Sequence, residues 1–433
     1  MRIGIIGGGP SGYSFALKVA DNNEVFLFEK EEVGGVCLNK GCIPTKSLIS
    51  SVEIYEMVKS YQKKPNWRKI QESKDLAIKR GLLGIKSLLK EKKVKVIKKE
   101  ARLKDDRKIE VDGETFSFDK VVLATGSKPI PPPFPIQGEF WDSTDALNAK
   151  ELPESLAIIG AGFVGIELSY IFSSLGCKVQ VIEKEAEILP GEDVEFTKIL
   201  RKSLIRKGIE FHLSSEVLEV KKENEKFNVF FKEKGKNKDI IVEKVIVCIG
   251  RIPNIEGIPE EIVEKDRVKV NEFLETEIEN VYAIGDCIGG YLLAHSAFKE
   301  AEILAENILG RKVRKDNYVI PKVLYTKPEF ASVGFSEKET LKENYKISKL
   351  PFASNGRAIA EGKTSGYVKI IHSGNGEILG GVIIGERASE LISILSLAII
   401  NKLGLKELSE CVFPHPTFSE IIRDVSSIAL ADQ

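Results

Sequence analysis

The sequence has no excess of either charge, because its 64 lysines and arginines balance its 64 aspartates and glutamates. A neutral chain lacks the electrostatic attraction that draws proteins to nucleic acid or to an anionic membrane surface, so neither partner is expected. It also has no apolar run long enough to span a bilayer, and no charged and apolar leader precedes the strand expected at 2–6. We therefore expect a cytoplasmic protein.

Histidine and cysteine are scarce, with four and six residues in the chain. Two of the cysteines, Cys37 and Cys42, lie in the stretch GGVCLNKGCIPTKSL, 34–48, without a histidine or a second cysteine pair nearby. No metal site is therefore expected. Stable structural disulfides are rare in the cytosol, so the pair reads as a catalytic disulfide, with two reduced cysteines buried in the core as the alternative. Lys46 follows Cys42 by four residues and would share its face of a helix.

The start of the chain carries the pattern of a dinucleotide-binding module. An apolar strand, RIGII, is followed by three glycines at the spacing of a phosphate-binding loop: Gly7, Gly9 and Gly12. A helix expected from Ser11 to about Ala20 would point its N-terminus at a pyrophosphate. The next strand, 24–28, ends in Glu29, whose carboxylate suits the two hydroxyls of a ribose.

The same pattern returns in the middle of the chain, where LAIIGAGFVG, 156–165, repeats the first module. Its glycines are Gly160, Gly162 and Gly165. A strand expected at 178–182 ends in Glu183, which would accept from a 2′-hydroxyl and repel a 2′-phosphate, so NAD is favoured over NADP. Glu167, in the helix between them, is either an acid near the N-terminal dipole or the partner of Lys46 across a domain interface.

Other strands also end in small residues that suit a passing cofactor. The strand at 121–126 ends at Gly126, that at 245–250 ends at Gly250, and YAIGDCIGG places Asp286 at a strand end. The stiff segment 129–138 indicates a domain crossover. The last third contains strands expected at 322–325, 366–371 and 378–384 but no third glycine loop.

His415 is the histidine whose neighbours suggest chemistry. It lies between Pro414 and Pro416, and Glu420 follows five residues later. A histidine with a carboxylate on the next helix turn is the arrangement that a general base needs. The alternative is a structural histidine.

These motifs together resemble the pyridine nucleotide–disulfide oxidoreductases of the dihydrolipoamide dehydrogenase and glutathione reductase group. The resemblance covers essentially the whole chain, in the family's order, and includes YTKPEFASVG, 325–334, and HPTFSE, 415–420. Within the group, CLNKGCIPTK, LAH at 293–295, ILPGED at 188–193 and Glu183 are most similar to the dihydrolipoamide dehydrogenases.

The resemblance implies an α/β fold with two Rossmann-like dinucleotide-binding domains, one for FAD and one for NAD, and a C-terminal α+β dimerisation domain. The implied boundaries are 1–145 and 257–318 for the FAD domain, 146–256 for the NAD domain and 319–433 for the dimerisation domain.

The resemblance also implies roles for individual residues. The FAD contacts match Gly7, Gly9, Gly12, Glu29, Lys46, Ala101, Gly126, Asp286 and Ala294. The NAD contacts match Gly160, Gly162, Gly165, Glu183, Val217 and Gly250. Cys37 matches the thiol that meets the substrate, and Cys42 matches the thiol beside the flavin. From the pairing considered above, and not from the resemblance, Lys46 and Glu167 are also expected among the catalytic residues. His415 and Glu420 match the base and its orienting partner, and the base comes from the other subunit of an obligate homodimer.

The implied activity is the oxidation of protein-bound dihydrolipoamide with NAD as acceptor. The implied partner is a lipoyl-bearing protein of a 2-oxoacid dehydrogenase or glycine cleavage complex. Val36 replaces a threonine that commonly helps to hold the FAD diphosphate, and Phe413 and Pro414 replace the usual HA before His415. An NADH-dependent reductase of another low-molecular-weight disulfide, an NADH oxidase and a non-catalytic docking subunit are the alternatives.

Overall fold

The chain, described by a computed structural model over residues 1–61, 64–105, 107–315, 318–340 and 345–432, divides into two compact units. The first unit comprises 1–131, 142–150 and 249–317. The second comprises 132–141, 151–248 and 318–433. The division into FAD, NAD and dimerisation domains at the boundaries given above stays a prediction.

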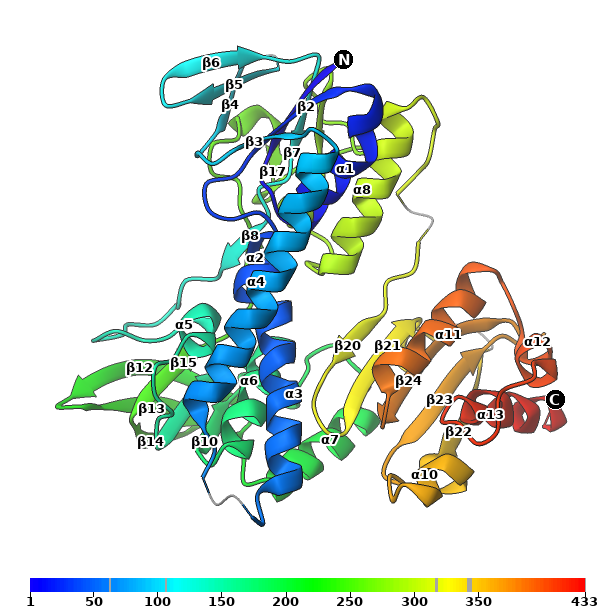
Figure 1. Cartoon of the computed structure of the whole chain (residues 1–433). Coiled ribbons are helices and arrows are strands. Elements are labelled where there is room, and N and C mark those ends of the chain that lie inside the picture. Colours follow the sequence, from blue (N-terminus) through cyan, green and yellow to red (C-terminus); the bar gives the residue numbers. More distant parts are fainter. Residues whose placement is uncertain (62–63, 106, 316–317, 341–344, 433) are drawn as a thin grey trace. The chain divides into compact units, whose positions relative to one another are not determined.

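A five-stranded parallel sheet forms the centre of the first unit, with strand order β19-β7-β1-β2-β3 (Figure 1). Its strands are β1 (Arg2–Ile6), β2 (Glu24–Phe28), β3 (Lys95–Ile97), β7 (Lys120–Leu123) and β19 (Val281–Ala283). β1 and β2 are buried at four consecutive positions, the pattern of parallel strands covered on both faces. Two helices, α1 (Pro10–Val19) and α8 (Ala294–Ile308), pack against each other beside it.

The cysteine stretch begins a series of helices in the first unit. These helices are α2 (Gly35–Lys40), α3 (Cys42–Val58), α4 (Trp67–Glu91) and the short α5 (Ser143–Leu147). The buried Lys74 of α4 donates to the carbonyl of Leu147 at 3.0 Å and to Asn148 Oδ1 at 2.8 Å. Trp67 Nε1 donates to the carbonyl of Ala149 at 2.8 Å. α4 therefore fixes the segment that precedes the second glycine loop.

Small antiparallel sheets complete the first unit. One contains β4 (Arg102–Asp105), β5 (Lys108–Val111) and β6 (Glu114–Ser117), and two pairs are formed by β8 (Ser127–Pro129) with β16 (Arg251–Pro253) and β17 (Val263–Glu264) with β18 (Arg267–Val268). The β4–β6 sheet was not predicted, because its four-residue strands are too short to show a clear apolar alternation.

The second unit contains a parallel sheet of order β11-β10-β9-β15, the counterpart of the first unit's sheet. Its elements are β9 (Ser155–Ile159), α6 (Phe163–Ser174), β10 (Lys178–Ile182), α7 (Val194–Arg206), β11 (Glu210–His212) and β15 (Lys244–Val247). An antiparallel meander of β12 (Ser215–Glu223), β13 (Lys226–Glu233) and β14 (Lys236–Val242) is inserted before β15.

The C-terminal part of the second unit is an antiparallel sheet of order β20-β21-β24-β23-β22. Its elements are β20 (Lys322–Leu324), β21 (Glu329–Gly334), α9 (Glu337–Thr340), β22 (Lys346–Pro351), α10 (Gly356–Ala360), β23 (Tyr367–His372), β24 (Ile378–Gly385), α11 (Ala388–Ile400), α12 (Leu405–Glu410) and α13 (Glu420–Ala431). α11 and α13 share one apolar core with the sheet. β21 and β22 were not predicted, because β21 is rich in small residues and β22 is a largely exposed edge strand. The predicted α/β class is confirmed.

The ILPGED motif links the nucleotide-binding part of the second unit to this C-terminal sheet. Lys369 of β23 is only 2% exposed, and its Nζ lies 2.8 Å from Asp193 and 2.7 Å from Glu337. Burial alone would lower the pKa of Lys369, but these hydrogen bonds outweigh it and the pKa is raised. Glu192 accepts from Lys322 Nζ and Ser332 Oγ, both at 2.7 Å. Among the described residues, no helix combines the length and apolar character that crossing a membrane requires.

Candidate active site

The first glycine loop brings β1 and α1 into contact that only glycine permits. Gly7 has φ +108°, and a Cβ there would lie 2.1 Å from the carbonyl oxygen of Ala124. A Cβ on Gly12 would lie 1.9 Å from the carbonyl oxygen of Gly7. The first turn of α1 has no side-chain cap and no acidic residue. Its backbone N–H groups therefore suit a pyrophosphate.

Glu29 lies beside this loop at the carboxyl end of β2. Its Oε2 accepts from the backbone N–H of Gly8 at 2.7 Å, and its Oε1 accepts from that of Glu31 at 2.8 Å. A cavity of about 80 Å³ is lined by Gly7, Glu29, Ala101 and Thr125 among others. A nucleotide ribose fits these residues, because the carboxylate and the loop border one hollow.

The second glycine loop has the same close glycine contacts and the same glutamate hydrogen bonds as the first. Gly160 has φ +104°, and a Cβ on Gly165 would lie 2.0 Å from the carbonyl oxygen of Gly160. Glu183 accepts from the backbone N–H of Ala161 at 2.6 Å and from that of Glu185 at 2.8 Å. A Cβ on Gly162 would meet no atom within 4 Å, so the space before α6 is open to a ligand. The residues present fit a second dinucleotide.

Two predicted NAD contacts lie outside the second glycine loop. Val217 is buried on β12 of the same unit. Gly250 belongs to the first unit, where its carbonyl accepts from the backbone N–H of Ile130 at 3.1 Å. Their contact with NAD stays a prediction.

The cysteine stretch is fixed to the first glycine loop. The backbone N–H of Gly34 donates to the carbonyl of Gly8 at 2.7 Å, and a Cβ on Gly35 would lie 2.6 Å from Gly9 Cα. The chain therefore passes the expected pyrophosphate position immediately before α2, which carries Cys37.

Cys37 and Cys42 are both thiols in the structure, and they form a hydrogen bond with each other. That hydrogen bond, followed by burial, raises the pKa of Cys37, while the charge of Lys46 acts in the opposite direction. Cys42 is the first residue of α3, and Lys46 lies one turn later on the same helix. Cys42 and Lys46 therefore lie one turn apart on a helix, as their spacing in the sequence predicted.

The remaining predicted FAD residues lie at strand and helix ends of the first unit. Gly126 follows β7 with φ +75° and faces open space, because a Cβ there would meet no atom within 4 Å. Asp286 lies in the 3-10 turn Gly285–Ile288 after β19, and Ala294 is the first residue of α8. Their roles toward FAD stay predictions.

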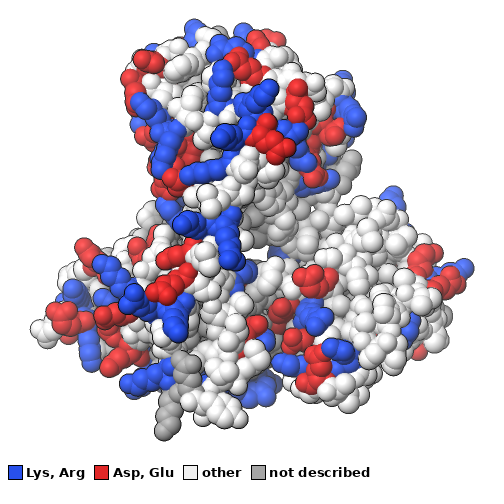
Figure 2. Space-filling view, viewed as in Figure 1, with Lys and Arg blue, Asp and Glu red and all other residues white. Residues whose placement is uncertain are grey.

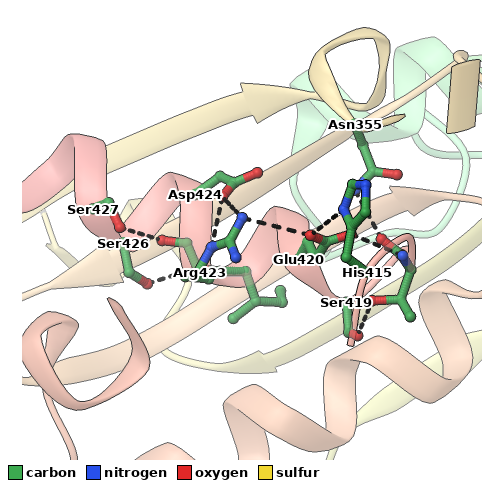
Figure 3. A network of polar contacts seen from close by, with 10 residues as sticks. Asn355, His415, Ser419, Glu420, Arg423, Asp424, Ser426 and Ser427 are labelled. Carbon is green, nitrogen blue, oxygen red and sulfur yellow. Dashed lines mark hydrogen bonds and ion pairs between the residues drawn. The ribbon is translucent and has the colours of Figure 1, made fainter. Parts of the chain in front are cut away.

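His415 and Glu420 form a polar pair at the start of α13 (Figure 3). His415 Nδ1 lies 3.0 Å from Glu420 Oε1, and Glu420 Oε2 accepts from the backbone N–H of Thr417 at 2.8 Å. Arg423 Nη2 lies 3.6 Å from the same carboxylate. The Thr417 N–H and then His415 hold the pKa of Glu420 below its ordinary value. A carboxylate ionised in this way orients the ring so that Nε2 is available to a substrate proton.

Asn355 is a supporting residue that the sequence analysis missed. Its Nδ2 donates to the carbonyl of Thr417 at 3.0 Å, and its Oδ1 accepts from the backbone N–H of Ala358 at the start of α10. It therefore ties the His415 turn to α10. No spacing pattern identifies this contact, because the two residues lie 62 positions apart.

Glu167 is buried in α6, and its Oε1 accepts from the backbone N–H of Tyr325 at 3.1 Å. Neither alternative in the sequence analysis included this contact with the C-terminal part of the second unit. The predicted pairing with Lys46, which belongs to the first unit, stays a prediction.

Two glycine loops of dinucleotide-binding type, with a cysteine pair fixed to the first of them, indicate a dinucleotide-dependent oxidoreductase. Residues 1–301 match the family described as pyridine nucleotide-disulphide oxidoreductase, and residues 320–426 match the dimerisation domain of that family. The chain belongs to this family. It is an NAD-dependent disulfide oxidoreductase with FAD as its second cofactor.

Similar proteins refine this placement. The chain is 38% identical to a dihydrolipoyl dehydrogenase of Thermus scotoductus, over 96% of this chain and 94% of that protein. It is 35% identical to a dihydrolipoyl dehydrogenase of Geobacillus stearothermophilus, over 98% and 95%. A solved structure of the HOCl-induced flavoprotein disulfide reductase RclA from Escherichia coli superposes with a TM-score of 0.90 at 25% identity, over 99% of this chain and 100% of that one.

Proposed function

We propose that this protein is a dihydrolipoamide dehydrogenase, which oxidises protein-bound dihydrolipoamide through the Cys37–Cys42 pair and passes a hydride to NAD. The observation that carries the proposal is the cysteine stretch fixed to the first glycine loop by the Gly34–Gly8 hydrogen bond. The names of the two bacterial relatives support it. The carboxylate of Glu183 supports NAD over NADP as the acceptor.

We assign the two cofactor sites to the residues that the family resemblance implies. FAD would be held by the first loop and by the residues around it: Gly7, Gly9, Gly12, Glu29, Lys46, Ala101, Gly126, Asp286 and Ala294. NAD would be held by Gly160, Gly162, Gly165, Glu183, Val217 and Gly250. When bound, FAD supplies the means to take an electron pair from a dithiol and give it to NAD as a hydride.

The chain's own residues carry out the thiol chemistry. His415 takes a proton from the substrate dithiol, and the resulting thiolate attacks the sulfur of Cys37 in the oxidised pair. The Cys37–Cys42 bond breaks and Cys42 leaves as a thiolate, which the charge of Lys46 favours. The second substrate thiol then displaces Cys37, so the substrate leaves as a disulfide and both cysteines are reduced. Glu420 keeps His415 in the required tautomer and stabilises its cation.

We infer a homodimer in which His415 of the partner subunit serves each cysteine pair. The match of residues 320–426 to the family's dimerisation domain supports this. Large apolar side chains are also exposed on the C-terminal part, including Val412 at 92% and Leu397 at 60%. On the face in view, Figure 2 shows few charged side chains over α11 and α13. Burial of such side chains is a main driving force for association.

Reduction of another low-molecular-weight disulfide is the second candidate function. The structural similarity to the disulfide reductase RclA favours it. Phe413 and Pro414 stand before His415 where the family usually has histidine and alanine, and this departure also favours a different substrate. An NADH oxidase is a third outcome of the same test.

The test compares substrates on the purified holoenzyme. We expect NAD reduction with free dihydrolipoamide, faster turnover with a lipoylated protein domain, and none in the C42S variant. Slow dihydrolipoamide turnover with rapid NADH-dependent reduction of glutathione disulfide or cystine would replace the proposal by the second candidate. Rapid oxygen consumption with NADH alone would indicate an oxidase.

A further inference from the structure

Three polar residues of the first unit form a hydrogen-bonded chain that ends at Asp286. Arg251, the first residue of β16, donates from Nε to Ser127 Oγ at 2.8 Å and from Nη2 to the carbonyl of Ser127 at 2.6 Å. Ser127, the first residue of β8, donates from Oγ to Asp286 Oδ2 at 2.5 Å. β8 and β16 pair antiparallel, with Ser127 opposite Pro253 and Arg251 opposite Pro129, so the backbone holds Ser127 and Arg251 on neighbouring strands. Asp286 lies in the 3-10 turn Gly285–Ile288.

The chemistry of the three groups determines which of them donates in each hydrogen bond. A guanidinium only donates, so Ser127 Oγ must accept from Arg251. The hydroxyl proton of Ser127 is therefore available to Asp286, whose Oδ2 it satisfies. Among the hydrogen bonds that the structure describes, none has Asp286 Oδ1 as its acceptor. A sugar-alcohol hydroxyl would supply the missing donor.

The charge of Arg251 supports the same arrangement. Burial lowers the pKa of Arg251, and the negative charges of Asp286 and Asp142 act in the opposite direction. The ordinary pKa of arginine is so high that the side chain stays cationic at neutral pH. Arg251 therefore keeps a positive charge behind the carboxylate of Asp286.

We propose that Arg251 and Ser127 are positioning residues for FAD, which orient Asp286 so that its second oxygen accepts from the sugar alcohol of the cofactor. The inference rests on the FAD site of the proposed function and assigns to it two residues outside the glycine fingerprint. Gly126, immediately before Ser127, faces open space, because a Cβ there would meet no atom within 4 Å.

The test measures FAD affinity rather than turnover. FAD is removed from the holoenzyme and titrated back into wild type, S127A, S127T and R251Q, with flavin fluorescence as the readout. We expect the Kd for FAD to rise about 10- to 100-fold in S127A and R251Q, the effect of losing a hydrogen bond to a charged group. S127T keeps the hydroxyl and should stay within about threefold of wild type. S354A, which removes an exposed serine hydroxyl from the C-terminal part of the chain, is the matched control.

The double variant S127A/R251Q tests whether the two residues act in series. Its Kd for FAD should be close to that of the single variant that binds FAD more weakly, because either change breaks the same series of hydrogen bonds. The inference would be overturned if the Kd of the double variant rose by the product of the two single-variant factors. It would also be overturned if S127A bound FAD as tightly as wild type does. Either result would leave the proposed function intact. Absence of FAD binding by the wild type would overturn both. Circular dichroism of each apoprotein identifies a variant that has failed to fold. In that case R251K decides the question. It keeps the positive charge and should bind FAD more tightly than R251Q does.

Discussion

The His415–Glu420 pair gives the sharpest prediction about catalysis. Replacement of His415 by glutamine removes the base that takes the dithiol proton, and general-base catalysis typically contributes about 10²- to 10⁴-fold. We expect NAD reduction with dihydrolipoamide to fall by that factor. The reverse half-reaction, in which NADH reduces the bound flavin, should continue, because it does not need this base.

Glu420→Gln isolates the contribution of the carboxylate charge. The His415 side chain is 79% exposed in the single chain and its Nδ1 lies 3.0 Å from Glu420 Oε1. Coulomb's law at that distance in water gives about 1.4 kcal/mol of stabilisation for a cationic ring, which is about tenfold in rate. Burial at a subunit interface would enlarge this value. We therefore expect a loss of at least about tenfold.

Steady-state NAD reduction at saturating dihydrolipoamide measures both losses, and stopped-flow absorbance at the flavin band measures the NADH half-reaction. Ser427→Ala is a suitable control, because this exposed hydroxyl of α13 donates only to the carbonyl of Arg423. Dithiol turnover of Glu420→Gln within twofold of wild type would refute the role of the charge. Unchanged turnover of His415→Gln would refute the assignment of the base.

Three further predictions concern stability, reactivity and cofactor choice. Lys369→Met leaves the buried carboxylate of Asp193 without its cation and should cost about 3 kcal/mol in urea unfolding, whereas Lys406→Met, at an exposed lysine, should cost little. In oxidised holoenzyme at pH 8, a thiol reagent should label Cys411 but not Cys177 or Cys287, because burial raises the pKa of each to about 12, and NADH should expose two more thiols. Glu183→Gln should raise KM for NADH about tenfold and lower that for NADPH; an unchanged ratio of the two would contradict the ribose assignment.

The parts of the site that the sequence predicted are those whose residues lie close together along the chain. The glycine triplets, the acid about 22 residues later and the His415–Glu420 pair each fall within one supersecondary unit, so spacing alone fixes their geometry. Cys42 and Lys46 share a helix for the same reason. Strand β22 was not predicted, because an exposed edge strand needs no apolar alternation.

The parts that the sequence did not predict depend on residues brought together by the tertiary fold. Glu167 accepts from Tyr325 across 158 positions, and Ser127 reaches Asp286 across 159. Lys369 reaches Asp193 across 176 positions, and an isolated lysine in a strand gives no sign of three carboxylate neighbours. Such contacts have no local period, so a single sequence contains no signal for them.

The two glycine loops share hydrogen bonds that are typical of an internal duplication. In both copies a glutamate at the end of the second strand accepts from the loop and from the residue two positions later, as an internal duplication would leave them. The segment after that acid has then diverged. In the first copy it carries Cys37 and Cys42, and in the second it carries Glu192 and Asp193, which anchor the C-terminal sheet. The same connection thus carries the cysteine pair in one copy and an anchor in the other, so replacing the segment after Glu183 by that of the first copy would remove the contacts that hold the neighbouring sheet.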